Sequence, residues 1–169
     1  FTGMRVGIAS AQAIAQVIDV SIIPVTSLDI LAAAVQTGND VITSIVDARR
    51  GEVYWSLYRM ADGKLKQVGK PQIGTPEMCA VDVLDRGQST LLVGTGALKH
   101  EVEFRERLNP VLPALEFADD KHSMPLASTL VEIAHERALR GEWVLVDEVV
   151  PMYLRAPDAE INWATRSAQ

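Results

Sequence analysis

Residues 41–70 read VITSIVDARRGEVYWSLYRMADGKLKQVGK. Three runs in this stretch read as strands, 41–48, 51–60 and 64–70, and the first two are rich in β-branched and aromatic residues. A turn around Arg49-Arg50-Gly51 separates the first two runs, and a tighter turn at Asp62-Gly63 separates the last two. Strands joined by such short turns lie antiparallel to one another. We therefore predict a three-stranded antiparallel meander.

The second of these strands alternates its large apolar side chains between two faces. Val53, Trp55 and Leu57 fall on one face, and Tyr54 and Tyr58 fall on the other. A strand with apolar or aromatic residues on both sides is typical of a sheet that is covered twice. We therefore expect both faces of the sheet to be at least partly covered.

The segments on either side of the meander predict further helices and strands. C-terminal to it, we expect helices over 77–85, 97–108 and 123–140, a buried strand over 90–94 and an edge strand over 115–118. N-terminal to it, we expect a helix over 1–20, a short strand over 22–25 and a second helix that Thr26 and Asp29 begin. A meander followed by alternating helices and strands is typical of a ribonuclease-H-like lobe, so the predicted fold class is α/β.

The first predicted helix has an unusually wide apolar surface. At about 100° per residue, its polar side chains form one narrow stripe that contains Arg5, Gln12, Gln16 and Asp19. The apolar arc spans roughly 220°, whereas a helix that covers a single core needs only about 100°. Two explanations remain open: the helix is enclosed between elements of its own domain, or one flank packs on its own chain and the other binds a partner.

Small residues spaced by four run along the middle of this arc, where another backbone could approach closely. This arc is the first candidate partner interface, and it contains Gly3, Met4, Gly7, Ile8, Ala11 and Ala15. A second candidate set joins the double-arginine turn to an apolar stretch between two prolines, and it contains Arg50, Tyr153, Leu154 and Arg155. A solvated turn, and a tail that docks back onto the first lobe, are the competing explanations of the second set.

Composition limits the functional classes. The chain has 169 residues, 48% of them hydrophobic, and a formal net charge of −6. Cys79 is the only cysteine, so no internal disulfide can form, and no apolar run approaches the roughly 20 residues that span a membrane. We expect a soluble cytoplasmic protein. Because the sequence has no basic stripe, we expect it to bind nucleic acid only weakly by itself.

The sequence contains no recognisable motif for catalysis or metal binding. His100, His122 and His135 are too far apart for a metal pair, and the phosphate-binding motif G-x-x-x-x-G-K does not occur. Asp47 and the Gly94-Thr95-Gly96 turn could be remnants of a nucleotide site, although a helix start explains the glycine turn more simply. We therefore predict no cofactor, no metal and no catalytic residue.

Four segments of the chain resemble one bacterial protein family, in the order in which they occur there. They read FTGMRVGIASAQAIA at 1–15, IPVTSLDILA at 23–32, VDARRGEVYW at 46–55 and PMYLRAPDAE at 151–160. These segments are similar to those of the TsaB family of tRNA threonylcarbamoyladenosine biosynthesis proteins, which are YeaZ-like and glycoprotease-like. In that family a strand-rich segment precedes the first helix, so the resemblance implies that this chain lacks the N-terminal segment.

The resemblance implies a duplicated fold of ribonuclease-H-like lobes, as in the actin, Hsp70 and sugar-kinase superfamily. On this basis, residues 1–41 are a remnant of the first lobe, which would be incomplete. Residues 42–149 form the second lobe, and residues 150–169 form an extended C-terminal tail.

The resemblance also implies a function, that of a non-catalytic scaffold subunit. Its partners would be a catalytic paralogue of the same fold (TsaD-like) and an ATPase subunit (TsaE-like). Their complex forms N6-threonylcarbamoyladenosine next to the anticodon of tRNAs that read codons beginning with A, and tRNA would be bound only through the complex. The alternatives are an independent glycoprotease-type peptidase, an ATP-dependent kinase of the same superfamily, or a homodimeric interaction module.

Overall fold

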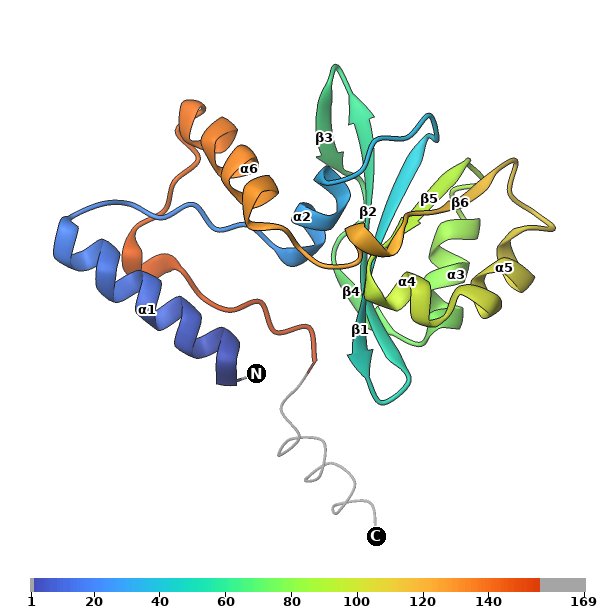
Figure 1. Cartoon of the computed structure of the whole chain (residues 1–169), viewed down its shortest axis with the longest axis horizontal. Coiled ribbons are helices and arrows are strands. Elements are labelled where there is room, and N and C mark those ends of the chain that lie inside the picture. Colours follow the sequence, from blue (N-terminus) through green and yellow to red (C-terminus); the bar gives the residue numbers. More distant parts are fainter. Residues whose placement is uncertain (1, 156–169) are drawn as a thin grey trace, which may run out of the picture.

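The computed structural model describes residues 2–155, and one mixed β-sheet forms its centre (Figure 1). Strands β1 (Val41–Arg49) and β2 (Glu52–Ala61) pair antiparallel, and β3 (Lys64–Gln67) pairs antiparallel with β2. On the other side of β1, strands β5 (Thr90–Val93) and β6 (Leu115–Phe117) add in parallel. The resulting order is β3-β2-β1-β5-β6, which confirms the predicted meander and the α/β fold class.

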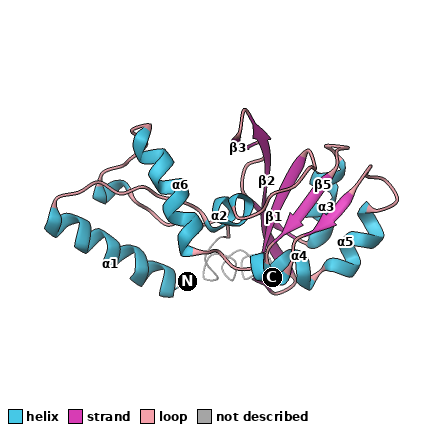
Figure 2. Cartoon of the chain, turned by 45° about the horizontal axis from the view of Figure 1, so that its top comes forward, coloured by secondary structure: helices cyan, strands magenta, loops and turns pink. Residues whose placement is uncertain are grey.

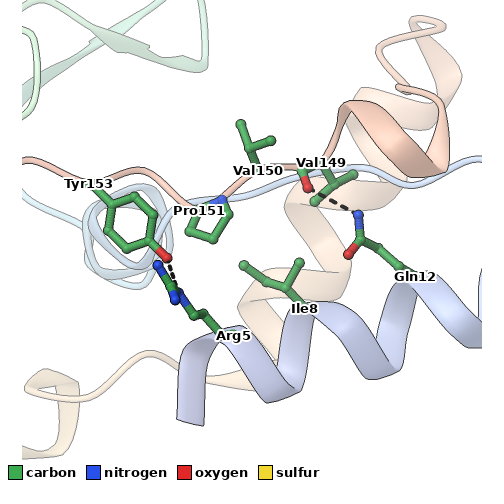
Figure 3. A pocket seen from close by; sticks show the side chains of 7 residues that line it. All are labelled: Arg5, Ile8, Gln12, Val149, Val150, Pro151 and Tyr153. Atoms are coloured by element: carbon green, nitrogen blue, oxygen red, sulfur yellow. Dashed lines mark hydrogen bonds between the residues drawn. The ribbon is translucent and has the colours of Figure 1, made fainter. Parts of the chain in front are cut away.

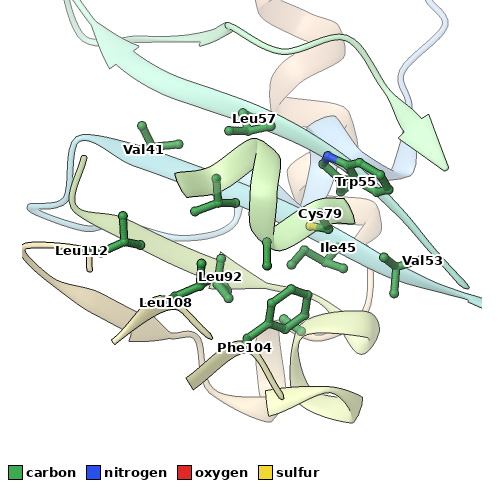
Figure 4. Close-up of a cluster of buried hydrophobic side chains, with 13 residues drawn as sticks. Val41, Ile45, Val53, Trp55, Leu57, Cys79, Leu92, Phe104, Leu108 and Leu112 are labelled. Atoms are coloured by element: carbon green, nitrogen blue, oxygen red, sulfur yellow. The ribbon is translucent and has the colours of Figure 1, made fainter. Parts of the chain in front are cut away.

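Helices cover both faces of this sheet, as Figure 2 shows. One face packs against α3 (Pro76–Leu84), α4 (Thr95–Lys99) and α5 (Glu101–Leu108), and Figure 4 shows Trp55, Cys79 and Phe104 gathered in the core between them. The other face packs against α2 (Ser27–Ala33), whose Leu28 and Leu31 meet Tyr58 in a second core. The predicted alternation along the second strand is therefore confirmed.

The turn between β5 and α4 approaches β1 so closely that only glycine fits. Gly94 has a φ of 109°, and a Cβ atom there would lie 2.4 Å from the carbonyl oxygen of Ile45. A Cβ atom at Gly96 would lie 2.7 Å from Cγ2 of the same isoleucine. Gly94 is the N-cap of α4. The glycine turn therefore starts a helix and lets it pack directly on β1, which is the simpler of the two explanations given for it.

Asp29 ties α2 to the sheet and to helix α6 (Ala127–Leu139). The predicted capping box is present: the Asp29 N–H donates to Thr26 Oγ1 (3.1 Å), and the Thr26 N–H donates to Asp29 Oδ2 (3.3 Å). The same carboxylate accepts the Tyr58 hydroxyl at 2.9 Å and pairs with Arg137 Nη2 at 3.0 Å. Burial, reinforced by the Asp29 charge, holds the pKa of Tyr58 well above its ordinary value, so the phenol stays protonated and can donate.

Two predicted strands are shorter than expected. The strand predicted over 22–25 is reduced to one antiparallel bridge between Ile22 and Val144, because Pro24 has no N–H group with which to extend it. The strand predicted over 64–70 ends at Gln67, and β4 (Gln72–Gly74) pairs separately with β2. Val68 and Gly69 both donate their N–H groups to the Leu57 carbonyl, which interrupts the regular pairing.

Two predicted helices also differ in extent. The helix predicted over 97–108 is broken at His100 (φ −110°, ψ 23°), since α4 packs directly on β1 while Phe104 and Leu108 of α5 reach the core beside α3. The helix predicted over 123–140 covers only Ala127–Leu139, since its N-cap Leu126 has extended backbone (φ −96°, ψ 136°) and Pro125 disfavours helical backbone at Met124. A short 3-10 turn, η1 (Asp120–His122), precedes that helix.

The predicted lobe boundaries, at residues 41 and 149, stay a prediction. Helix α2, from the predicted remnant of the first lobe, packs on the sheet of the predicted second lobe. Residues 156–169 of the predicted tail lie outside the described residues. Within residues 2–155, no helix has both the length and the apolar character that crossing a membrane requires.

We predict that Gly94→Ala lowers the free energy of unfolding by about 3 kcal/mol, because the new Cβ atom would both meet the Ile45 carbonyl and require a strained positive φ. Urea denaturation of the two chains measures this difference. Gly38→Ala is the matched control, since no atom lies within 4 Å of a Cβ at Gly38, and its effect should stay within about 0.5 kcal/mol. Equal effects of the two variants would contradict the close-packing explanation.

Candidate functional site

Helix α1 (Thr2–Ile18) lies apart from the sheet and packs on the C-terminal part of the described chain (Figure 1). Its main neighbour is the segment that begins with the 3-10 turn η2 (Val146–Glu148). Asp19, in a left-handed conformation (φ 56°), ends the helix, and the Val20 N–H closes it by donating to the Ala15 carbonyl (3.0 Å). Ala15 is the only buried residue of α1.

The polar side of α1 faces this segment, as Figure 3 shows. Gln12 Nε2 donates to the carbonyls of Val146 (2.7 Å) and Val149 (3.1 Å). Arg5 Nε donates to the Tyr153 hydroxyl (2.5 Å), and its guanidinium carbon lies 5.3 Å from the centre of that ring. These contacts border an open groove of about 490 Å³, which is lined by Arg5, Ile8, Gln12, Val149, Val150, Pro151 and Tyr153.

The apolar arc of α1 is open to solvent. Val17 is 85% exposed, Ile14 is 62% exposed and Val6 is 59% exposed. No atom lies within 4 Å of a Cβ built at Gly3 or Gly7, so these two members of the small-residue row are also uncovered in the described chain. Contiguous exposed apolar surface of this kind marks interaction sites in soluble proteins.

The six residues of the first candidate interface divide between these two sides of the helix. Gly3, Met4, Gly7 and Ala11 are exposed on the open arc. Ile8 is half-buried and lines the groove beside the C-terminal segment, whereas Ala15 is buried and its carbonyl accepts the Val20 N–H.

The second candidate set divides in the same way. Tyr153 contacts Arg5 of α1, and Arg155 pairs with Glu52 at the start of β2. Leu154 is half-buried, whereas Arg50 is exposed at the tip of the β1–β2 hairpin. The segment around Tyr153 therefore docks back onto the chain, which is one of the two explanations that the sequence left open.

The residues that could have been remnants of a nucleotide site form ion pairs and hydrogen bonds within the chain. Asp47 pairs with Lys99 (2.9 Å), and its Oδ1 accepts the Arg49 N–H (3.0 Å). The hydrogen bond from Lys99 is the main cause that lowers the pKa of Asp47, so this carboxylate is ionised at neutral pH. The Asp47 N–H donates to Thr95 Oγ1 (3.2 Å), which links β1 to the glycine turn.

The histidines do not meet. His100 lies between α4 and α5, His122 lies in η1 and His135 lies in α6. In residues 2–155, no three side chains of the types that bind metals form a group. Cys79 is fully buried, and burial raises the pKa of its thiol well above the ordinary value.

The sequence did not identify which side of α1 contacts its own chain. Arg5 and Gln12 belong to the polar stripe, and a polar stripe is normally assigned to solvent. One signal was available: residues 5, 8, 12 and 15 recur at intervals of three and four, which is the spacing of a helix face that packs against something. Two of those four residues are polar because Gln12 meets backbone carbonyls and Arg5 meets the Tyr153 hydroxyl and ring.

We predict that Gln12→Leu loosens α1 from the C-terminal segment, because the Val146 and Val149 carbonyls lose a donor and leucine offers none. Hydrogen exchange of residues 144–153 should become about tenfold faster, which corresponds to the loss of about 1.4 kcal/mol of local stability. Gln16→Leu is the control, since Gln16 is exposed on the same helix, and exchange should then be unchanged. Equal exchange rates in both variants would show that Gln12 does not hold the C-terminal segment on α1.

Comparisons with known proteins identify the same family that the four sequence segments resemble. The model of the TsaD family, described as tRNA N6-adenosine threonylcarbamoyltransferase, matches residues 1–163. The chain is 31% identical to the tRNA threonylcarbamoyladenosine biosynthesis protein TsaB of Bacillus subtilis, covering 96% of this chain and 68% of the relative. It is 27% identical to TsaB of Escherichia coli, covering 92% of this chain and 66% of the relative.

Other relatives are similar over a comparable length. An uncharacterized protein of Mycobacterium tuberculosis is 34% identical, covering 95% of this chain and 61% of the relative. The chain thus spans about two thirds of the length of these curated relatives.

Two solved structures from Pseudomonas aeruginosa share the fold. One is described as an uncharacterized protein with similarity to peptidase YeaZ; its TM-score is 0.71 at 28% identity, and the match covers 92% of this chain and 68% of that one. The other is YeaZ, with a TM-score of 0.70 at 29% identity over 90% of this chain and 69% of that one. The α/β fold is that of the actin, Hsp70 and sugar-kinase superfamily. With a family model matched over residues 1–163 and TsaB relatives aligned along nearly its whole length, the chain belongs to the TsaB family of tRNA threonylcarbamoyladenosine biosynthesis proteins.

Proposed function

We propose that the chain is a non-catalytic scaffold subunit of the complex that forms N6-threonylcarbamoyladenosine in tRNA, and that α1 binds a catalytic paralogue of the same fold. The single observation that carries this proposal is the open apolar arc of α1. An ATPase subunit (TsaE-like) would complete the complex, and tRNA would be bound through the assembly.

The arc has the features that a helix-to-helix contact needs. Burying Val6, Ile14 and Val17 alone would gain about 5 kcal/mol. Gly3 and Gly7 leave room for a neighbouring helix to approach at the short end of the usual interaxial range of about 8–10 Å. The hydrogen bonds of α1 to the C-terminal segment come from Arg5 and Gln12, so a partner could bind Val6, Ile14 and Val17 without displacing them.

The relationship between the TsaB and TsaD families supports a partner of the same fold. The model named for the threonylcarbamoyltransferase matches this chain, so the transferase and this chain are built on related folds. A symmetric homodimer would pair one α1 with another α1 through the same surface. A paralogue that carries an equivalent helix could take the place of one copy, which supports a heterodimer with the TsaD-like transferase.

The non-catalytic role is supported by the groups that could have been reactive, because each of them serves the structure of the chain. Asp47 is engaged by Lys99 and by the Arg49 backbone, and the glycine turn next to it packs on Ile45. Cys79 lies in the core behind Trp55 and is unsuited to act as a nucleophile. Asp47 and the glycine turn therefore have structural partners inside the chain, and the Cys79 thiol is enclosed in the core.

A peptidase is the second candidate, because one of the similar Pseudomonas aeruginosa structures is described by its similarity to peptidase YeaZ. We predict that the purified chain neither cleaves a glycoprotein substrate nor hydrolyses ATP, since Asp47 already has its cationic partner in Lys99. Gel electrophoresis of the substrate and release of inorganic phosphate are the measurements. A turnover that disappears in Asp47→Asn, but persists in the surface variant Asp62→Asn, would establish an enzyme and contradict the proposal.

We predict that Gly7→Arg abolishes binding to the TsaD-like transferase. A guanidinium buried without a partner costs several kcal/mol, which weakens a micromolar complex more than about 100-fold. The isolated chain should fold at least as well as before, because space around Gly7 is open and arginine favours a helix by about 0.8 kcal/mol over glycine. Size-exclusion chromatography with light scattering measures binding, and thermal unfolding measures folding.

The control for this variant is Gly38→Arg, at an exposed and equally open glycine outside α1, and it should leave binding intact. If the Gly7→Arg chain binds the transferase normally, the arc is not the interface. The second candidate set would then be tested first: Arg50, Tyr153, Leu154 and Arg155. Self-association that Gly7→Arg abolishes, with no binding of the transferase by the wild-type chain, would instead establish a homodimeric interaction module.

A further inference from the structure

A group of exposed cations surrounds β3 and the C-terminal end of α3. We call this group the basic edge, and its members are Arg59, Lys64, Lys66, Lys70 and Arg86. Lys66 pairs with the exposed Asp62 at 3.4 Å. Within residues 2–155, the other four members have no carboxylate within ion-pair distance. The fold therefore concentrates uncompensated positive charge here, on a chain whose formal net charge is −6.

The carboxylates near the basic edge do not cancel this charge. Asp62 and Asp85 adjoin it in sequence, and they stand against five cations. Glu142, which feels the charge of Lys64, is engaged by Arg140 at 2.5 Å. The basic edge therefore keeps a positive balance.

Two guanidinium groups of the basic edge are held in place by neutral acceptors. Arg59 Nη2 donates to Gln88 Oε1 (2.5 Å), and Arg86 Nη2 donates to the Val68 carbonyl (3.2 Å). A carboxylate acceptor would have cancelled the charge, whereas an amide or peptide oxygen leaves it intact. Each of these bonds uses one of the five N–H donors of a guanidinium group. The two arginines are thus oriented without being neutralised.

Protection of the sheet edge explains only part of this group. Lysines on an edge strand such as β3 prevent unwanted strand pairing. Arg59, however, lies on the inner strand β2, and Arg86 follows a helix. Arg59 also lies directly opposite Lys66 in the β2–β3 pairing, and like charges in that position destabilise a sheet. The arrangement therefore points to an anion that the group binds.

The length of the basic edge indicates a chain of phosphates. Residues 64–72 run beside β2 from Ala61 to Trp55, which is about 20 Å of strand. Successive phosphates of one nucleic-acid strand follow one another about every 3.4 Å along the axis of a duplex, so an edge of this length can meet several of them. Guanidinium groups bind phosphate oxygens with paired hydrogen bonds, and released counterions favour the contact even at a wet surface. An exposed ion pair with a protein carboxylate gains much less.

We propose that the basic edge binds phosphates of the tRNA backbone in the assembled complex; this inference rests on the proposed scaffold function. Figure 1 shows the β2–β3 hairpin projecting at one end of the sheet, away from α1, so a partner on α1 leaves the basic edge accessible. The contact supplies affinity and orientation and reads no sequence, as is usual for phosphate contacts. A few such contacts on an acidic chain give little affinity until a partner holds the same RNA.

The test uses the complex of this chain with the TsaD-like transferase, and an unmodified tRNA transcript is the probe. Filter binding over a salt series compares the wild-type chain with the double variant Arg59→Gln/Arg86→Gln. We expect the affinity near physiological salt to fall about tenfold. The slope of log K against log salt should become shallower by about 1.5, because each lost phosphate contact removes about 0.7 to 0.9. Both side chains are exposed, so the thermal midpoint should change little.

Two further variants separate a phosphate contact from other effects. Arg107→Gln/Lys121→Gln removes the same charge from exposed positions outside the basic edge, and both affinity and slope should stay unchanged because salt screens distant charges. Arg59→Lys/Arg86→Lys keeps the charge, so the slope should return to that of the wild type, with affinity restored in part because lysine lacks the planar fork. An equal loss in the Arg107/Lys121 variant, or no recovery with lysine, overturns the inference.

Assembly is measured separately, by size-exclusion chromatography without RNA. Unchanged tRNA binding by an intact Arg59→Gln/Arg86→Gln complex overturns the inference and leaves the scaffold proposal standing. Loss of assembly in that variant also overturns it, since the basic edge would then contact a protein. Displacement of the tRNA by inorganic phosphate at constant ionic strength would indicate a site for free phosphate and overturn it as well. A wild-type chain that does not assemble with the transferase refutes the scaffold proposal and this inference together, before any RNA is added.

Discussion

The carboxylate of Asp29 is the contact on which the arrangement of the helices outside the sheet depends. It caps α2, accepts the Tyr58 hydroxyl from the centre of the sheet and pairs with Arg137 of α6. Hydrogen bonds to a charged group are worth about 1.5–3 kcal/mol each when they are shielded from water. One side chain thereby joins a helix start, a strand and a helix that is more than 100 residues distant in sequence.

The position of α1 follows from this connection through a short series of contacts. Arg137 also donates to the Pro24 carbonyl (2.8 Å), and the nearby bridge between Ile22 and Val144 brings the two chain segments together. The C-terminal segment then presents two carbonyls to Gln12 of α1. Arg5 and Gln12 hold α1 through its polar side, whereas Val6, Ile14 and Val17 of the apolar arc stay exposed, and this open surface is the basis of the proposed scaffold role.

At the C-terminal end of β1, the residues that resemble remnants of a nucleotide site serve packing instead. Lys99 and the Arg49 backbone occupy the two oxygens of Asp47, and the turn at Gly94 rests on the Ile45 carbonyl. The hairpin that follows β1 carries a double arginine where an asparagine would be less strained. In the proposed scaffold, α1 serves contact with protein.

The sequence by itself determined the elements whose causes are local. Alternation along 51–60 predicted the two covered faces of the sheet, and Thr26 with Asp29 predicted the start of α2. The quoted segments indicated the family. Each of these signals lies within a few neighbouring residues. Only the tertiary structure decided that Arg5 and Gln12 face the chain, that the helix over 97–108 breaks at His100, and that Asp29 meets Arg137. A helical wheel assigns polar residues to water since it contains no information about what lies opposite, and here the opposite surface is a row of backbone carbonyls and a tyrosine hydroxyl contributed by residues more than 130 positions away.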